Sequence, residues 1–146
     1  MNIPNTFGIA ATADCYLEVG SEDELRQLLS SHQLHGTPLF VIGGGSNVVF
    51  TRHYEGCVLH MKNKGIHLIG EEDGSLLVEA AAGEVWDDFV HHCIAHGWHG
   101  AENLVAIPGT VGAAPVQNVG AYGVEAKDII HSVRAFDIFT GDEHRL

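Results

Sequence analysis

The sequence predicts an α+β protein in which a small α/β unit is followed by a second, mostly antiparallel α+β unit. Between residues 15 and 42, a strand-like, a helix-like and another strand-like segment follow one another, which is the order of a parallel α/β unit. From residue 66 onward, strand-like segments are joined by short turns, which favours antiparallel pairing. We therefore expect a first unit over residues 1–62 and a second unit over residues 63–146.

The first predicted strand covers residues 15–19, and a helix is expected directly after it. Ser21 is a typical N-cap residue, and Glu24 three positions later completes the pattern of a capping box. Gly36 is expected to end the helix. The side chains that would form its buried stripe are leucines at helical spacing, namely Leu25, Leu28 and Leu29.

The next predicted strand covers residues 38–42, a continuous apolar run that is typical of a strand covered on both faces. It leads directly into a glycine-rich segment, residues 43–47, which we call the first glycine loop. Ligands of α/β sheets bind beyond the carboxyl ends of the strands. This loop is therefore a candidate binding site.

The second unit is expected to begin with a hairpin whose strands lie at residues 66–69 and 76–80, joined through an acidic tip at residues 71–74. A helix over residues 84–96 should follow, with acids in its first turn and histidines in its last, as the helix dipole favours. Its apolar positions are Val85, Trp86, Phe89, Val90, Cys93 and Ile94, which we interpret as core residues and not as cofactor-stacking residues.

The last predicted elements are a strand over residues 133–139, a turn at residues 140–142 and a return strand that runs to Leu146. A domain rarely ends on a fresh strand without partners, because the open edge of that strand invites aggregation. We therefore expect residues 1–146 to be the front part of a longer protein, with the second unit incomplete.

Composition excludes several functional classes. Seven Lys and Arg against 19 Asp and Glu give a net charge of −12, which argues against a nucleic-acid partner. Three widely spaced cysteines without a C-x-x-C pair are typical of reduced thiols in a cytosolic protein. No signal peptide is visible, and no apolar run approaches the ~18 residues of a membrane span. We predict a cytoplasmic protein without a membrane partner.

The first glycine loop matches neither common nucleotide-binding signature. G-x-G-x-x-G would need a glycine at Val48, and the Walker pattern needs a lysine that does not occur before Lys62. Consecutive glycines still allow several N–H groups to converge on an anion. The residues expected to do so are Gly43, Gly44 and Gly45, with side-chain hydrogen bonds from Ser46 and Asn47. The alternative is a tight turn after a buried strand.

A second glycine loop covers residues 107–123 and contains no charged residue. A segment so rich in Gly, Ala and Pro should not pack a core by itself, but it would suit a wall of backbone against a flat, apolar ring system. Gln117 and Asn118 could then bind the polar edge of that ring. Long loops in compact domains are more often functional or disordered than idle.

The second loop resembles a known family. The pattern I-P-G-x-V-G-A-x-P-x-Q-N-x-G-A-Y-G, preceded by Glu102-Asn103-Leu104, is similar to that of the UDP-N-acetylenolpyruvoylglucosamine reductase family (MurB, UDP-N-acetylmuramate dehydrogenase). The first loop and the early Asn5-Thr6-Phe7-Gly8 resemble the same family, in the same order. The Pro115-x-Gln117-Asn118 version resembles its type I branch.

This resemblance implies a vanillyl-alcohol-oxidase or PCMH-type FAD-binding fold. It also implies an enzyme that uses NADPH to reduce FAD and then reduces the enolpyruvyl ether of a UDP-sugar substrate for peptidoglycan synthesis. In the family a serine protonates the intermediate, with an arginine and a glutamate assisting. The arginine lies in a C-x-F-G-Y-R-x-S segment that this chain does not contain. We therefore expect the catalytic residues and the substrate-binding domain beyond Leu146, and no turnover from residues 1–146 alone.

The residues expected to bind FAD lie in the two glycine loops, and Tyr122 is also considered for a substrate contact. They are Gly43, Gly44, Gly45, Ser46, Asn47, Pro108, Gly109, Thr110, Gly112, Ala113, Gln117, Asn118, Gly120, Tyr122 and Gly123. Two other functions stay open at this point. One is another PCMH-type oxidoreductase, and the other is a non-catalytic nucleotide-binding module.

Other residues have simpler interpretations. His91, His92, His96 and His99 invite a metal hypothesis, but no carboxylate or thiolate ligand stands at a matching spacing, and we predict no metal site. Ser46 lacks the G-x-S-x-G pattern of a nucleophile.

Overall fold

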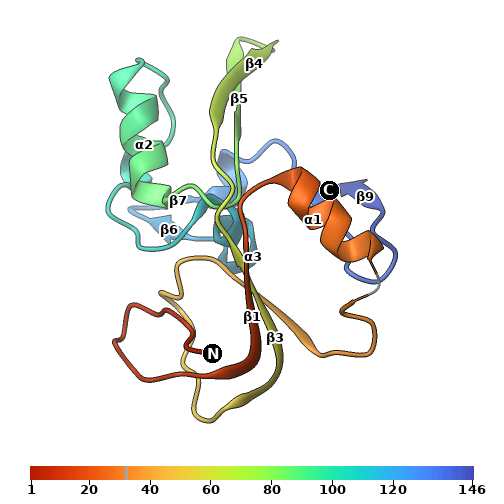
Figure 1. Ribbon diagram of the computed structural model, residues 1–146. Helices are drawn as coiled ribbons and strands as arrows, with labels where there is room; N and C mark the ends of the chain where they lie inside the picture. The colour runs from red at the N-terminus through yellow and green to blue at the C-terminus, as the bar shows by residue number, and fades with distance from the viewer. Residues whose placement is uncertain (32) are drawn as a thin grey trace. The chain divides into compact units, whose positions relative to one another are not determined.

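The computed structural model describes residues 1–31 and 33–146, which form two compact units (Figure 1). The first comprises residues 1–62 and 132–146, and the second comprises residues 63–131. Among the described residues, no helix is long and apolar enough to cross a membrane.

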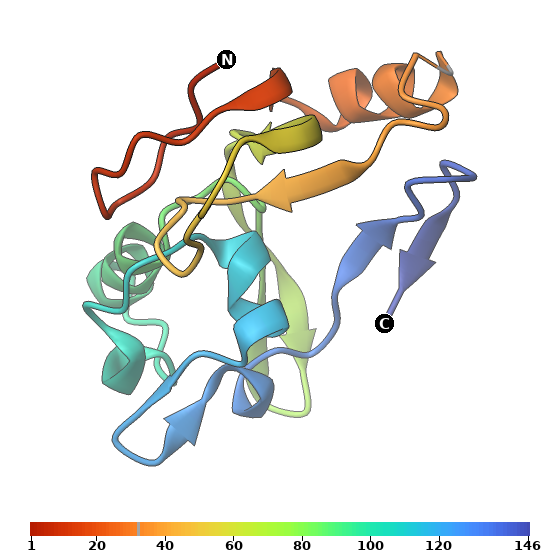
Figure 2. The same ribbon diagram turned by 90° about the horizontal axis from the view of Figure 1, so that it is seen from below.

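The first unit contains a sheet of three parallel strands in the order β1-β3-β2, visible side by side in Figure 2. The strands are β1 (Ala13–Val19), β2 (Leu39–Ile42) and β3 (Tyr54–Met61). Strands at residues 15–19 and 38–42 were expected, and both are confirmed. The central strand β3 was not predicted, although it holds three of the most deeply buried residues of the chain: Cys57, Val58 and Leu59.

One expectation for this sheet is wrong. The apolar run of residues 38–42 suggested a strand covered on both faces, but β2 is an edge strand and Val41 is 52% exposed. The strand with two neighbours and full burial is β3 instead. Its apolar run is short, and Gly56 within it weakens the strand pattern.

The helix α1 (Glu22–Ser30) follows β1 as predicted, with Ser21 as its N-cap. The Ser21 hydroxyl accepts a hydrogen bond from the Glu24 N–H at 3.1 Å. The Glu24 carboxylate accepts from the N–H of Gly20 at 2.7 Å, one residue before the N-cap, so the capping box is displaced by one position. The helix ends at Ser30, well before Gly36, and none of its leucines is fully buried.

One face of the sheet packs against the N-terminal segment and against residues 50–54. The core here comprises Ile3, Ala11, Ala13, Ile42 and Val58, with the rings of Tyr16, Phe40, Phe50 and Tyr54 around it. The last three rings meet edge to face, with centroids between 5.5 and 6.4 Å apart. This packing fixes the start and the end of β2, and with them the position of the first glycine loop.

The N-terminal segment also holds the first glycine loop directly. The N–H of Thr6 donates to the carbonyl of Gly45 at 3.3 Å. Gly45 has φ +65°, and a Cβ at this position would stand 2.7 Å from the carbonyl oxygen of Pro4. Both the backbone conformation and the close approach therefore require glycine here.

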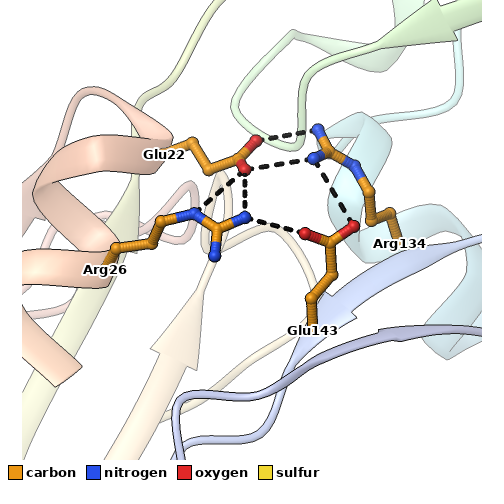
Figure 3. A network of polar contacts seen from close by, with 4 residues as sticks. All are labelled: Glu22, Arg26, Arg134 and Glu143. Atoms are coloured by element: carbon orange, nitrogen blue, oxygen red, sulfur yellow. Dashed lines mark hydrogen bonds and ion pairs between the residues drawn. The ribbon is translucent and has the colours of Figure 1, made fainter. Parts of the chain in front are cut away.

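The strands β8 (Arg134–Phe136) and β9 (Glu143–Arg145) pair antiparallel and belong to the first unit. Figure 3 shows the network that ties them to α1. Arg134 makes a bidentate pair with Glu22 at 2.8 and 3.0 Å, and Arg26 contacts Glu22 at 2.8 Å and Glu143 at 2.7 Å. The Arg26 guanidinium also stands 4.5 Å from the centre of the Phe136 ring.

This network explains a difference from the predicted division of the chain. The sequence pattern placed residues 132–146 in the second unit, as a continuation along the chain. The structure groups them with the first unit, because ion pairs between residues far apart in the sequence join them to α1. Local periodicity contains no signal for such pairs.

The second unit begins with the predicted hairpin, formed by β4 (Ile66–Glu72) and β5 (Ser75–Ala80). Its turn residues Asp73 and Gly74 both have positive φ, 50° and 77°, as in the turns that suit the twist of a hairpin. The acidic tip is exposed, as expected.

The helix α2 (Trp86–Ala95) confirms the helix expected near residues 84–96. Trp86 is 3% exposed and donates its indole N–H to the carbonyl of Leu104 at 2.9 Å, so its assignment to the core is confirmed. Val85 and Ile94 keep 41% and 45% exposure, which makes the buried face narrower than predicted. The buried core residues are Trp86, Val90, Ala101, Leu104, Ala114 and Ala126.

Short elements complete the second unit. They are η1 (Glu102–Leu104), η2 (Val111–Ala113), α3 (Ala114–Gln117), β6 (Gly120–Ala121), β7 (Val124–Glu125) and η3 (Ala126–Asp128).

We predict that the first unit loses stability in acid through Glu22. Hydrogen bonds from Arg26, supported by Arg134 and opposed by burial, hold the pKa of Glu22 below its ordinary value of 4.5. A carboxyl with a lowered pKa contributes its stability above the ordinary pKa and loses it as pH falls through the lower, folded-state pKa. E22Q should therefore lower the melting temperature near neutral pH and shrink that deficit below about pH 4. Circular dichroism melts across this range test the prediction, and a deficit independent of pH would contradict it.

We also predict that G45A destabilises the first unit by roughly 1–3 kcal/mol, because alanine is strained at positive φ and its Cβ meets the Pro4 carbonyl. G70A is the matched control, since a Cβ at Gly70 meets nothing within 4 Å. Urea unfolding followed by circular dichroism measures both variants. Equal stability of G45A and the unchanged protein would show that the loop is not held as described.

Candidate functional site

The first glycine loop lies at the carboxyl end of β2, directly after Ile42, which pairs with His60 of β3. Gly45 is buried, Gly43 and Ser46 are half-buried, and Gly44 and Asn47 are exposed. The loop therefore combines a fixed interior point with accessible backbone on either side of it.

Within the described parts of the chain, no protein acceptor takes a hydrogen bond from the N–H of Gly43, Gly44, Gly45 or Ser46. The Gly45 carbonyl, in contrast, is engaged by the N–H of Thr6. Consecutive free N–H groups carry partial positive charge and can bind an anion without a basic side chain.

Tyr16 of β1 lies beside His60 of β3, the residue that pairs with Ile42 at the end of β2. The hydroxyl of Tyr16 lies 2.5 Å from Nδ1 of His60 and donates to Glu18 at 3.1 Å. Burial raises the pKa of Tyr16 to about 12. Burial, assisted by Lys62, lowers the pKa of His60 below its ordinary 6.5, so its imidazole is neutral at pH 7. An anion at this loop would depend on the backbone N–H groups.

The second glycine loop is more ordered than the sequence suggested. It contains η2, α3 and β6, and it contributes Ala114, 1% exposed, to the core of the second unit. The segment was expected not to pack a core by itself, and Ala114 belongs to a core that Trp86 and Leu104 form with it. Helical periodicity was not visible in so short an element.

Gly112 packs closely against Ala82. Its N–H donates to the carbonyl of Ala82 at 2.9 Å, and a Cβ at Gly112 would stand 2.6 Å from the Cβ of Ala82. The neighbouring N–H of Val111 donates to Glu84 at 2.9 Å. These groups fix the loop against residues 82–84.

Asn118 holds the end of the same loop. It ends α3 with φ 46°, its amide donates to Glu125 at 3.1 Å, and its side-chain oxygen accepts from the N–H of Lys127 at 3.1 Å. An ion pair with Lys127 and the Asn118 bond lower the pKa of Glu125. The Asn118 side chain is therefore engaged within its own segment, while Gln117 beside it is exposed.

Tyr122 stands at the tip of the β6–β7 hairpin. Tyr122 and Gly123 have φ 53° and 80°, and the tyrosine is 88% exposed. A bulky residue at positive φ is uncommon and draws attention to function. Beside the tip is an open cavity of about 590 Å³, lined by residues that include Asn118, Gly120, Ala121, Gly123, Val124 and Glu125.

Thr110 is the one unexplained polar residue in the described part of the second loop. It is 6% exposed, and its hydroxyl has no hydrogen-bond partner among the described residues. A buried hydroxyl without a partner costs free energy, so its presence calls for an explanation. Pro108 is exposed, and Gly109 and Ala113 next to Thr110 are half-buried.

Two histidines of the second unit stack on each other. His92 and His96 stack with centroids 4.2 Å apart, and Trp98 lies 4.8 Å from His96. In the described residues no group of three or more His, Cys, Asp or Glu side chains is arranged to hold a metal ion.

Comparison with known proteins gives a family for most of the chain. The family described as "FAD binding domain" matches residues 13–146. The UDP-N-acetylenolpyruvoylglucosamine reductase of Neisseria gonorrhoeae is 53% identical over 136 residues, which is 93% of this chain and 39% of that protein. The enzyme of the same name from Bacteroides fragilis is 51% identical over 140 residues, 96% of this chain and 42% of that protein. The chain thus spans about two fifths of the length of these relatives.

A solved structure shows the same fold. The crystal structure of UDP-N-acetylenolpyruvylglucosamine reductase from Thermus caldophilus matches 90% of this chain and 44% of its own with a TM-score of 0.68, at 24% sequence identity. The predicted α+β FAD-binding fold class is therefore confirmed. On the match over residues 13–146, the chain belongs to the FAD binding domain family.

Proposed function

We propose that this chain is the FAD-binding part of an NADPH-dependent reductase that converts UDP-N-acetylenolpyruvoylglucosamine to UDP-N-acetylmuramate for peptidoglycan synthesis. The observation that carries the proposal is 53% identity over 93% of the chain to a reductase of that name. The reductase would act in the cytoplasm and supply a precursor on which cell-wall growth, cell shape and division depend.

The first glycine loop would bind the diphosphate of FAD. The N–H groups of Gly43, Gly44, Gly45 and Ser46, for which the described residues show no acceptor, suit an anion, and Asn47 is exposed beside them. This arrangement also fits the net charge of −12, since the backbone and not a basic patch supplies the positive potential.

The second glycine loop would hold the ring system of FAD. We assign contacts to Pro108, Gly109, Thr110, Ala113 and Gln117. The buried hydroxyl of Thr110 is the observation that fits a cofactor best, because a polar atom of the ring would give it the partner that the protein does not provide. Gly112, Asn118, Gly120 and Gly123 would act mainly by shaping this segment.

The chemistry that the cofactor supplies when bound is hydride transfer, from NADPH to the double bond of the enolpyruvyl ether. The residues of this chain would bind and orient the cofactor, and we assign no proton transfer to residues 1–146. Tyr122 is proposed to contact the UDP-sugar, because its exposed ring projects from a tight hairpin.

We predict that the full-length protein is yellow, with absorbance peaks near ~450 and ~370 nm that bleach on addition of NADPH. Its bleached form should regain colour when UDP-N-acetylenolpyruvoylglucosamine is added. Bleaching without recovery would favour another oxidoreductase of the same fold. A colourless, folded protein that does not take up added FAD would contradict cofactor binding altogether.

We predict opposite effects of T110V on stability and on FAD binding in the full-length protein. Without FAD, the variant should be as stable as the unchanged protein or more stable, because an unpartnered buried hydroxyl costs about 1–3 kcal/mol. With FAD, the dissociation constant should rise about 10-fold, since one hydrogen bond to the cofactor is lost. T110S keeps the hydroxyl and serves as the control. Titration and thermal melts measure both effects, and unchanged affinity in T110V would refute the contact.

A further inference from the structure

Two of the three cysteines lie side by side in the sheet of the first unit. Cys15 of β1 is the direct partner of Cys57 in the parallel pairing with β3. Neighbouring strands run about 4.7–4.9 Å apart, which lies within the ~4.4–6.8 Å between Cα atoms of bridged cysteines. Partner residues in such a ladder also point to the same face of the sheet.

The two thiols differ in access. Cys57 is 0% exposed, whereas Cys15 is half-buried and can be reached from solvent. Burial first, and then a hydrogen bond with Cys15, raise the pKa of Cys57 to about 12. Cys15 is thus the accessible member of the pair and Cys57 the protected one. Cys93 lies in the other unit and is buried.

We propose that Cys15 and Cys57 form an oxidisable pair that closes into a disulfide by exchange with a small-molecule disulfide. The Cys15 thiolate attacks one sulfur of the oxidant, so that a bond between Cys15 and that sulfur forms and a thiolate leaves and takes up a proton. The Cys57 thiolate then attacks the Cys15 sulfur and expels the second half of the oxidant as a thiol. The two cysteines lose two hydrogens and two electrons, and the small disulfide is reduced to two thiols.

The bond would enclose the part of the first unit that carries the first glycine loop. Residues 15–57 contain α1, β2 and that loop, so β3 would be covalently joined to β1 while it stays hydrogen-bonded to β2. Closing such a loop restricts the unfolded chain and stabilises the folded unit. The pair would make the rigidity of this unit respond to redox conditions.

Oxidised glutathione tests the proposal on the full-length protein. Differential alkylation and peptide mapping should find the Cys15 and Cys57 peptides joined, with Cys93 still a free thiol, and dithiothreitol should reverse the bond. The oxidised form should melt at least about 5 °C higher than the reduced form. Closure should be faster at about pH 9 than at about pH 7, because the buried Cys57 must ionise to attack.

Matched variants separate the possible results. C93S should behave like the unchanged protein, whereas C15S and C57S should show neither the joined peptides nor the gain in melting temperature. Glutathione that remains attached to Cys15 while Cys57 stays free would overturn the proposal, and so would a disulfide between two molecules. Because C93S keeps both partners, the test does not depend on whether C57S folds.

Discussion

The burial of β3 between two parallel neighbours is the constraint on which the first unit depends. Cys57, Val58 and Leu59 are almost inaccessible to solvent, so this strand needs β1 on one side and β2 on the other. Parallel strands cannot be joined by tight turns, and their carboxyl ends meet at the same edge of the sheet. The chain therefore leaves β2 beside His60 and enters the first glycine loop at the edge where α/β proteins bind ligands.

Most of the cationic side chains in this acidic chain form ion pairs. Four of the seven Lys and Arg residues, namely Arg26, Lys64, Lys127 and Arg134, are in ion pairs within their own unit. In the network of Figure 3, each partner is about 34–44% exposed, so individual pairs contribute little, and the bidentate, connected geometry matters more. These four cations therefore serve the fold.

The local sequence pattern predicted the elements whose formation depends on residues close together in the chain. The capped start of α1, the β4–β5 hairpin with its Asp73-Gly74 turn, and the Trp86 face of α2 follow from spacing and capping. The central strand was missed because its apolar run, residues 57–59, is short and follows Glu55 and Gly56. The position of residues 132–146 depends on ion pairs between residues more than a hundred positions apart, which periodicity does not record. For the candidate site, the sequence showed the glycines as a motif. Only the structure shows that the N–H groups of Val111 and Gly112 bind residues 82–84, whereas those of residues 43–46 have no acceptor among the described residues. The early Asn5-Thr6 motif was part of the family resemblance, and in the structure the N–H of Thr6 binds the carbonyl of Gly45 in the first glycine loop.

The placement of the two tryptophans governs what emission spectroscopy can observe. Trp86, in a dry core, and Trp98, beside the stacked imidazoles of His92 and His96, both belong to the second unit, and the first unit contains none. Indole fluorescence therefore reports on the second unit alone. Loss of the parallel sheet, with its redox pair and first glycine loop, would therefore go unseen in the indole emission, although Tyr16 and Tyr54 lie in that unit.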